Sequence, residues 1–221
     1  MNDPTLQAPC LALFGATGRT GGHLLREALS RGWAVRALAR DPAQLSGHND
    51  RLLVVPGNVR DPEAVAACLL GARAIVTALG TRRGQESDDM LAVAMRHVVD
   101  AAQASGIRRV LAIATAGLLD APGGGLRRDA PGYPAAFRAG SGAHLAAFEH
   151  LRASDLEWTL VCPPDLVEGE RAQPLNVQPD RLPDGPKRAS MPALAAWLLD
   201  ELEAGAFVRR RVGLNNRDAE S

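Results

Sequence analysis

A glycine-rich turn near the start of the chain constrains the fold more than any other feature. Gly15, Gly18 and Gly21 directly follow an apolar run and open an amphipathic stretch. At this spacing the first glycine permits a tight turn, the second lets the backbone approach a pyrophosphate, and the third allows close helix–strand packing. The helix N-terminus then offers unpaired N–H groups to phosphates. The residues expected to contact a dinucleotide here are Gly15, Thr17, Gly18, Arg19, Thr20 and Gly21.

Short apolar runs alternate with helical patterns along the chain. The runs fit strands buried on both faces of a parallel sheet, and they cover residues 11–14, 34–38, 52–55, 74–78, 110–114 and 158–162. The helical patterns cover residues 22–30, 62–70, 88–104 and 143–153. This alternation predicts an α/β fold of the Rossmann type, with a doubly wound, mainly parallel sheet and helices on both faces. We expect a single domain over residues 1–221, with a flexible segment at 1–9.

Two stretches interrupt the alternation. Residues 117–142 are rich in glycine, alanine, proline and arginine and follow the fifth predicted strand, and the proline-rich residues 163–190 follow the sixth. Ligands of open α/β sheets bind beyond the carboxyl ends of the strands, where such loops lie. We therefore expect both loops on the substrate side of the site.

The end of the second predicted strand indicates which dinucleotide binds. An acidic residue there usually bonds the adenosine ribose 2′-hydroxyl of NAD, whereas this chain has Arg40, followed by Asp41 and Pro42. A guanidinium matches a 2′-phosphate, and Arg19 in the glycine turn is placed to reach the same group. Asp41 has a structural explanation as a cap before Pro42. NADP(H) is the expected cofactor, and a solvated strand-end charge is the alternative for Arg40.

Composition argues against several classes of function. The chain has 25 basic and 25 acidic residues, which gives no basic excess for a nucleic-acid partner. Its three cysteines are dispersed and its histidines lack metal-ligand spacing, so we expect buried thiols and no metal. The run Arg209–Arg211 at the end of a possible strand fits a solvated edge better than a phosphate-binding patch. No apolar run approaches the ~20 residues of a membrane span. A cytoplasmic protein, monomeric or homodimeric, is expected.

With its glycine turn and Arg40, the chain resembles the atypical short-chain dehydrogenases, and among them the NmrA-like NAD(P)H-binding proteins and the flavin reductase/biliverdin-IXβ reductase group. The resemblance runs through nearly the whole chain. It implies that the cofactor is also contacted by Asn58, Val59, Leu79, Gly80, Thr81, Arg82 and Pro163. It further implies that Thr115 lies near the nicotinamide and that Pro164 and Asp165 face the substrate.

Three residues depart from the family pattern. Asn58 replaces an aspartate, but an amide oxygen still accepts a hydrogen bond from the adenine amino group. Thr115 replaces a serine and keeps the hydroxyl on a stiffer side chain. Asp165 stands where the human-type flavin reductase has a histidine, so a role for that imidazole does not carry over.

The candidate chemistry is set by what the chain lacks. Dehydrogenases of the classical type pair a tyrosine with a lysine four residues later, but Tyr133 is followed at that spacing by Phe137. Hydride transfer to a flat conjugated acceptor such as a flavin, bilin or quinone needs mainly correct stacking. We therefore predict an NADPH-dependent reductase in which Thr115 orients the reactants, with Tyr133 and His144 on the substrate side. A strand-end threonine bonded to nearby backbone is the alternative for Thr115.

A non-catalytic NADP(H) sensor of the NmrA-like type is the second hypothesis. Such a regulator also lacks the tyrosine–lysine pair, and the low aromatic content of 4% favours it slightly over a flavin-stacking enzyme. Against the sensor, no segment of the sequence resembles a partner-binding tail or a DNA-reading helix.

Overall fold

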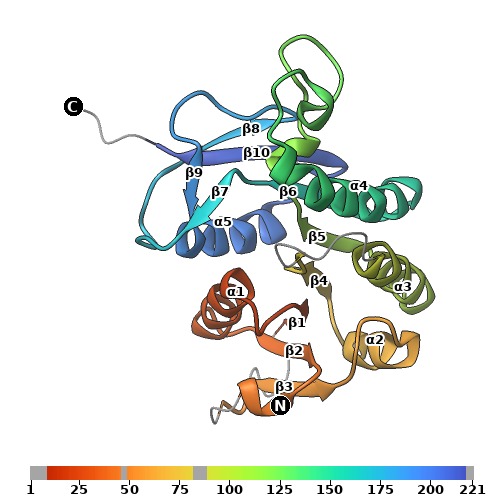
Figure 1. Ribbon diagram of the computed structural model, residues 1–221. Helices are drawn as coiled ribbons and strands as arrows, with labels where there is room; N and C mark the ends of the chain where they lie inside the picture. The colour runs from red at the N-terminus through yellow and green to blue at the C-terminus, as the bar shows by residue number, and fades with distance from the viewer. Residues whose placement is uncertain (1–8, 46–48, 82–88, 218–221) are drawn as a thin grey trace.

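The computed structural model describes residues 9–45, 49–81 and 89–217. Its centre is an eight-stranded sheet in the order β3-β2-β1-β4-β5-β6-β10-β8 (Figure 1). Neighbouring strands are parallel except β10 and β8, which pair antiparallel. The bounds of these strands are β1 Cys10–Phe14, β2 Ala34–Ala39, β3 Leu52–Pro56, β4 Ala74–Thr77, β5 Arg109–Ile113, β6 Glu157–Cys162, β8 Leu175–Pro179 and β10 Arg210–Asn216. Two short strands, β7 Asp165–Val167 and β9 Arg188–Ser190, pair separately.

Helices cover both faces of the sheet. Helices α1 and α5 pack together on one face, while α2, α3 and α4 cover the other, on the left and right of Figure 1 respectively. The bounds are α1 Arg19–Ser30, α2 Pro62–Leu69, α3 Met90–Ser105, α4 Arg138–Ala153 and α5 Met191–Ala204. The predicted Rossmann-type, doubly wound, mainly parallel sheet is therefore confirmed.

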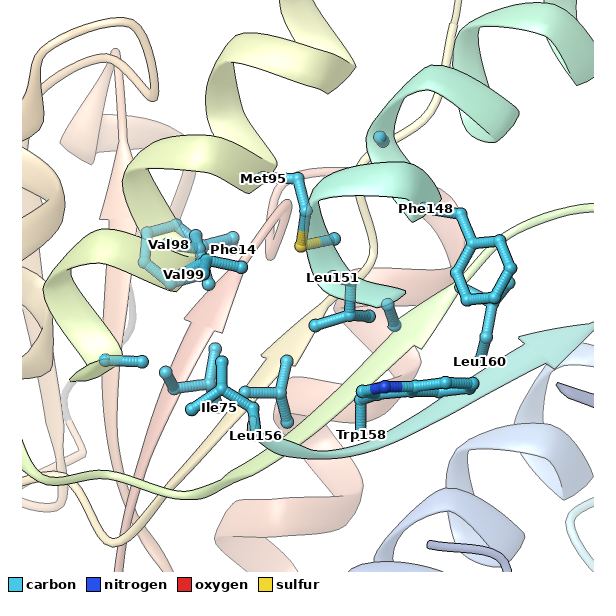
Figure 2. Close-up of a cluster of buried hydrophobic side chains, with 14 of the residues drawn as sticks. Phe14, Ile75, Met95, Val98, Val99, Phe148, Leu151, Leu156, Trp158 and Leu160 are labelled. Atoms are coloured by element: carbon cyan, nitrogen blue, oxygen red, sulfur yellow. The ribbon is translucent and has the colours of Figure 1, made fainter. Parts of the chain in front are cut away.

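Each face of the sheet has its own hydrophobic cluster. The cluster beneath α2, α3 and α4 contains fully buried Phe14 and Leu151, and Figure 2 shows side chains of α3 and α4 lying over those of the strands. Phe148 and Trp158 meet edge to face, with ring centroids 5.2 Å apart. A second cluster fills the space beneath α1 and α5. Burial on both faces explains why the strands read as continuous apolar runs rather than as alternating patterns.

The six predicted strands are confirmed, and the four predicted helices are present with shifted ends. Helix α4 begins at Arg138 instead of residue 143, because Gly140 and Gly142 hide the helical pattern at its start. Residues 117–142 thus end in a helix rather than in a loop, after the three 3₁₀ turns Ala116–Leu118, Arg127–Asp129 and Ala135–Phe137. Residues 163–190 are likewise more regular than predicted, since they contain β7, β8 and β9.

The basic run near residue 210 is corrected by the structure. Arg210 and Arg211 begin β10, whereas the sequence placed the run at the end of a strand. Arg211 is mostly buried, and its Nη2 lies 2.7 Å from Oδ1 of Asp120. Arg211 therefore forms an ion pair at the start of β10, and the interpretation as a solvated edge was wrong for this residue.

The cysteine prediction holds for two of three residues. All three thiols are free; Cys68 and Cys162 are buried, while Cys10 is partly exposed. Burial raises the pKa of Cys68 to about 12, so this thiol stays protonated near neutral pH.

Candidate functional site

The turn between β1 and α1 requires two of its three glycines for the fold itself. Gly15 has φ +87°, and a Cβ there would lie 2.6 Å from the carbonyl oxygen of Ala78 after β4. A Cβ on Gly21 would overlap the carbonyl group of Gly15. Gly18 differs, because its φ of −79° suits any residue and a Cβ would approach only the oxygen of Gly15, at 3.3 Å. Gly18 is exposed and leaves its open side to a ligand.

The N-terminus of α1 begins without a side-chain cap. Gly18 occupies the N-cap position, no side chain caps it, and the first turn carries no acidic residue. The first intrahelical bond is donated by the N–H of Gly22 to Gly18, so the N–H groups of Arg19, Thr20 and Gly21 have no acceptor further back in the helix. Thr17 is exposed beside them. Such a helix end fits a diphosphate, which supplies the missing acceptors.

Arg19 forms an ion pair with the segment that follows β7. Its Nη2 lies 3.6 Å from Oε1 of Glu168, and Nε2 of His23 lies 3.0 Å from the other carboxylate oxygen. Further along, Arg171 donates two bonds of 2.6 and 2.7 Å to Glu27 of α1. The segment 168–171 therefore lies along α1, a placement that no local sequence pattern indicates. In this structure Arg19 points to Glu168, and a 2′-phosphate would have to compete for it.

Arg40 and Asp41 have different roles in the structure. Arg40 is exposed at the end of β2 and has no hydrogen bond or ion pair to any other residue the structure describes. Oδ1 of Asp41 accepts a bond of 3.1 Å from the N–H of Ala43, which supports the 3₁₀ turn Pro42–Leu45. The structural explanation for Asp41 is confirmed, and the guanidinium of Arg40 remains available.

The turn after β3 is fixed by a hydrogen bond from a side chain of α3. Oδ1 of Asn58 accepts a bond of 3.1 Å from the N–H of Arg60, which leaves its second lone pair for another donor. Nδ1–H of His97 donates to the carbonyl oxygen of Val59 over 3.0 Å. Asn58 is exposed and Val59 half-buried, so this short turn presents a rigid amide.

The ends of β4, β5 and β6 lie next to one another. Leu79 is half-buried after β4, while Gly80 and Thr81 are exposed; Arg82 lies outside the described residues. Oγ1 of Thr115 accepts a bond of 3.4 Å from the N–H of Gly117, which is the local backbone bond left open as the alternative. The carbonyl oxygen of buried Pro163 accepts from the N–H of Ala116 over 2.9 Å. Thr115 and Pro163 are thus brought together.

The substrate-side residues divide into two groups. Pro164 is half-buried and Asp165 exposed at the start of β7. The Tyr133 hydroxyl packs against Gly117, where a Cβ would collide with it, and Cζ of Arg138 lies 6.0 Å from the centroid of its ring. Tyr133 therefore packs within its loop, as the missing lysine partner suggested.

His144 lies on the inward side of α4. Burial lowers its pKa to about 4, so the imidazole is neutral near pH 7. It makes no hydrogen bond to any described residue, although the buried Ser141 one turn earlier donates to the carbonyl oxygen of Phe137 over 2.8 Å. Phe137 itself, half-exposed at the start of α4, was not among the predicted site residues.

In the described part of the chain, no three His, Cys, Asp or Glu side chains lie close enough together to hold a metal ion, and no helix is long and apolar enough to span a bilayer.

These features define the class of protein. The strand order reverses between β1 and β4, and the glycine turn and uncapped helix lie at that point, where doubly wound sheets bind dinucleotides. The chain is a Rossmann-type dinucleotide-binding protein. It belongs to the NAD(P)H-binding family, which matches residues 15–204, as the resemblance predicted. Membership implies a nicotinamide cofactor.

Solved structures and a curated protein show the same relationship. A Burkholderia pseudomallei protein, provisionally named an exported protein, is 31% identical, with a TM-score of 0.81 over 94% of this chain and 99% of that one. A Streptococcus pneumoniae protein, provisionally named an NADH-flavin reductase, is 23% identical, with a TM-score of 0.78 over 95% of this chain and 100% of that one. Cinnamoyl-CoA reductase 1 of rice (Oryza sativa subsp. japonica) is 31% identical over 50% of this chain, and the match spans only 35% of that enzyme.

Proposed function

We propose that the protein is an NADPH-dependent reductase of a flat conjugated acceptor such as a flavin, bilin or quinone. The observation that carries the proposal is the uncapped N-terminus of α1 behind Gly15, Gly18 and Gly21, at the carboxyl edge of the sheet. This arrangement suits the diphosphate of the cofactor and directs the rest of the molecule along the strand ends.

The preference for NADPH rests on Arg40. Its exposed guanidinium at the end of β2 has no partner among the described residues, so it offers a bidentate contact to a 2′-phosphate without first breaking another bond. NADH lacks this group and would leave Arg40 solvated.

The reaction needs little acid–base chemistry from the protein. A bound nicotinamide dinucleotide would supply the hydride, and a proton from solvent would complete the two-electron reduction of the acceptor. Thr115, fixed by its bond with the Gly117 N–H, orients the reactants at the end of β5. Tyr133 has no lysine partner and packs in its loop, which supports positioning rather than general-acid catalysis.

The names of two relatives agree with a reductase. The Streptococcus protein is provisionally named an NADH-flavin reductase, and the rice enzyme is named a cinnamoyl-CoA reductase, although the match spans only 35% of its length. The flavin-type acceptor fits this chain better, because a chain without the tyrosine–lysine pair suits an acceptor that needs only stacking.

A second candidate function is an NADP(H) sensor without turnover. One observation favours it: Oγ1 of Thr115, the candidate catalytic group, accepts a bond from the Gly117 N–H, so the residue has a structural role that needs no substrate. Such a protein would bind the cofactor and leave the acceptor site unused.

One experiment separates the two candidates. Loss of NADPH absorbance is followed with FMN, riboflavin and a naphthoquinone, with and without the protein, while NADPH-induced stabilisation is measured in parallel. A reductase gives protein-dependent oxidation and a raised Tm. Stabilisation without oxidation of NADPH by any acceptor would support the sensor instead.

A further inference from the structure

One face of α1 is bonded along its length to a segment that is distant in the sequence. Residues four apart lie on the same face of a helix. On this face Arg19 and His23 lie 3.6 and 3.0 Å from the two carboxylate oxygens of Glu168. One turn further on, Glu27 accepts two bonds from Arg171. The face of α1 that begins with Arg19 is therefore the face that the segment 168–171 covers.

This face of α1 is directed towards α5. Arg31, on the same face, donates to Oδ1 of Asp200 and to the carbonyl oxygen of Ala196, both in α5, over 2.6 and 3.0 Å. Helix α1 contacts α5 as well as β2, and Figure 1 shows it between the two. Arg40 directly follows β2. The two arginines considered for the phosphates, Arg19 and Arg40, thus lie towards different sides of α1.

The backbone around Glu168 is fixed by the start of α5. A Cβ on Gly169 would lie 2.9 Å from Oγ of Ser190, the N-cap residue of α5. The same hydroxyl donates to the carbonyl oxygen of Glu170 over 2.9 Å. Glu168 therefore has a defined position beside the first turns of α1.

The carboxylate of Glu168 has a second partner besides Arg19. Arg26 can only donate, so Nδ1 of His23 accepts its bond of 3.0 Å. The proton of a neutral imidazole is then on Nε2, which donates to Glu168 over 3.0 Å. Glu168 thus keeps a hydrogen bond if Arg19 turns to another anion.

Glu168 provides the negative charge that the first turn of α1 itself lacks. A carboxylate is stabilised near a helix N-terminus, and a phosphate is stabilised at the same place. The ion pair between Arg19 and Glu168 is long, and the two side chains are 69% and 66% exposed, so it is weak. A phosphate offers a guanidinium a stronger, bidentate contact. Arg19 can therefore exchange Glu168 for a phosphate.

We propose that Glu168 regulates the proposed cofactor site by holding Arg19 in the free protein and yielding it to the diphosphate of the bound dinucleotide. The 2′-phosphate is left to Arg40 on the β2 side. The inference rests on the proposed cofactor site and adds its regulation. Glu168 is a positioning residue that acts through Arg19. Because NADPH and NADH share the diphosphate, Glu168 lowers the affinity for both by the same factor.

Calorimetric titration with NADP⁺ and NAD⁺ tests the role of Glu168. Glu168→Gln removes the charge and nearly keeps the shape, and it should raise the affinity for both dinucleotides roughly 2- to 5-fold, the size of an exposed ion pair. At about 1 M salt, where charges are screened beyond ~3 Å, this gain should disappear. Glu170→Gln removes the same charge two residues away, where the exposed carboxylate bonds to no described residue, and should change neither affinity.

Arg19→Ala tests which phosphate takes the guanidinium. It should weaken NADP⁺ and NAD⁺ by the same factor, roughly 3- to 10-fold, and leave their ratio unchanged. Arg40→Ala, in contrast, should change the ratio. In the Arg19→Ala background, Glu168→Gln should have no further effect, because the group that it releases is gone. A purely structural role of Glu168 would produce neither the gain nor its dependence on Arg19.

The outcomes separate this inference from the proposed reductase. A changed NADP⁺ to NAD⁺ ratio in Arg19→Ala would assign Arg19 to the 2′-phosphate and overturn the inference. A gain from Glu168→Gln that persists without Arg19 would indicate general charge repulsion and overturn it as well. Unchanged affinities in Glu168→Gln refute it, even if wild type oxidises NADPH with an acceptor. The predicted gain supports it, even if wild type turns over no acceptor. If neither dinucleotide binds, the inference fails.

Discussion

Replacing Gly18 by valine tests whether the turn between β1 and α1 holds the phosphates of the cofactor. The backbone of Gly18, with φ −79° and ψ 167°, is open to valine, and its Cβ would approach the oxygen of Gly15 at 3.3 Å. The Gly15 carbonyl must shift by a few tenths of an ångström to admit this Cβ, and that cost is set against the ~0.4–1 kcal/mol that loss of glycine's unfolded-state freedom contributes. The free energy of unfolding should therefore change by less than about 1 kcal/mol, while the side chain fills the space of the pyrophosphate.

The measurement is the NADPH-induced rise in Tm. At about 100 times Kd the cofactor stabilises the native state by ~2.7 kcal/mol, which for a domain of this size is about 5–11 °C. Gly18→Val should keep the circular dichroism spectrum and the Tm of the free protein but lose this rise. A rise equal to that of wild type would show that the phosphates bind elsewhere.

Gly21→Ala is the matched comparison, because it affects the same turn through packing. A Cβ there would overlap the carbonyl group of Gly15, which must then move. Overpacking against backbone costs roughly 3 kcal/mol, or about 6–12 °C in Tm. The two variants should therefore differ in free-protein stability, and equal Tm values would contradict the different roles assigned to the two glycines.

Three other expectations follow from the site and its supports. Arg40→Ala should lower the ratio of NADPH to NADH affinity roughly tenfold by calorimetry, and an unchanged ratio would refute the NADP assignment. Thr115→Val should lower kcat less than about tenfold if the hydroxyl only positions the reactants, whereas a thousandfold fall would make it an obligatory acid. Glu27→Gln should destabilise the fold by about 1–3 kcal/mol in urea at pH 7, because Arg171 and Arg31 lose a buried carboxylate. The hydrogen bond from Arg171 lowers the pKa of Glu27 in the folded state. The carboxylate of Glu27 therefore stabilises the fold fully above its unfolded pKa of about 4.5, and this stabilisation is lost as pH falls through the lowered pKa. A difference in stability between Glu27→Gln and wild type that persists at pH 2 would contradict this.

The parts of the site that were predictable are those encoded by neighbouring residues. The turn through Gly15, Gly18 and Gly21 has its strand before it and its helix after it, and the cap at Asp41 lies next to the residues it supports. Each of these is a local backbone requirement, so the sequence pattern carries it directly.

The missed features depend on residues that are distant along the chain. Glu168 meets Arg19 only because the segment after β7 crosses back over α1, and no spacing rule links positions 149 apart. The start of α4 approaches Thr81 after β4 closely because Gly140 has no side chain, but glycines at a helix start are typical of a loop. Tertiary packing thus decides which segments border the candidate site.

The position of β10 has a consequence for synthesis. Because β10 lies between β6 and β8, the sheet cannot be completed until residues 210–216 have left the ribosome. Until then β6 presents a row of unpaired N–H and C=O groups, which is a template for another nascent chain. The dinucleotide turn is made first and lies several strands away from this edge. A chain that stops before β10 would thus carry an intact phosphate turn beside an open, aggregation-prone edge, and adding cofactor would not close it.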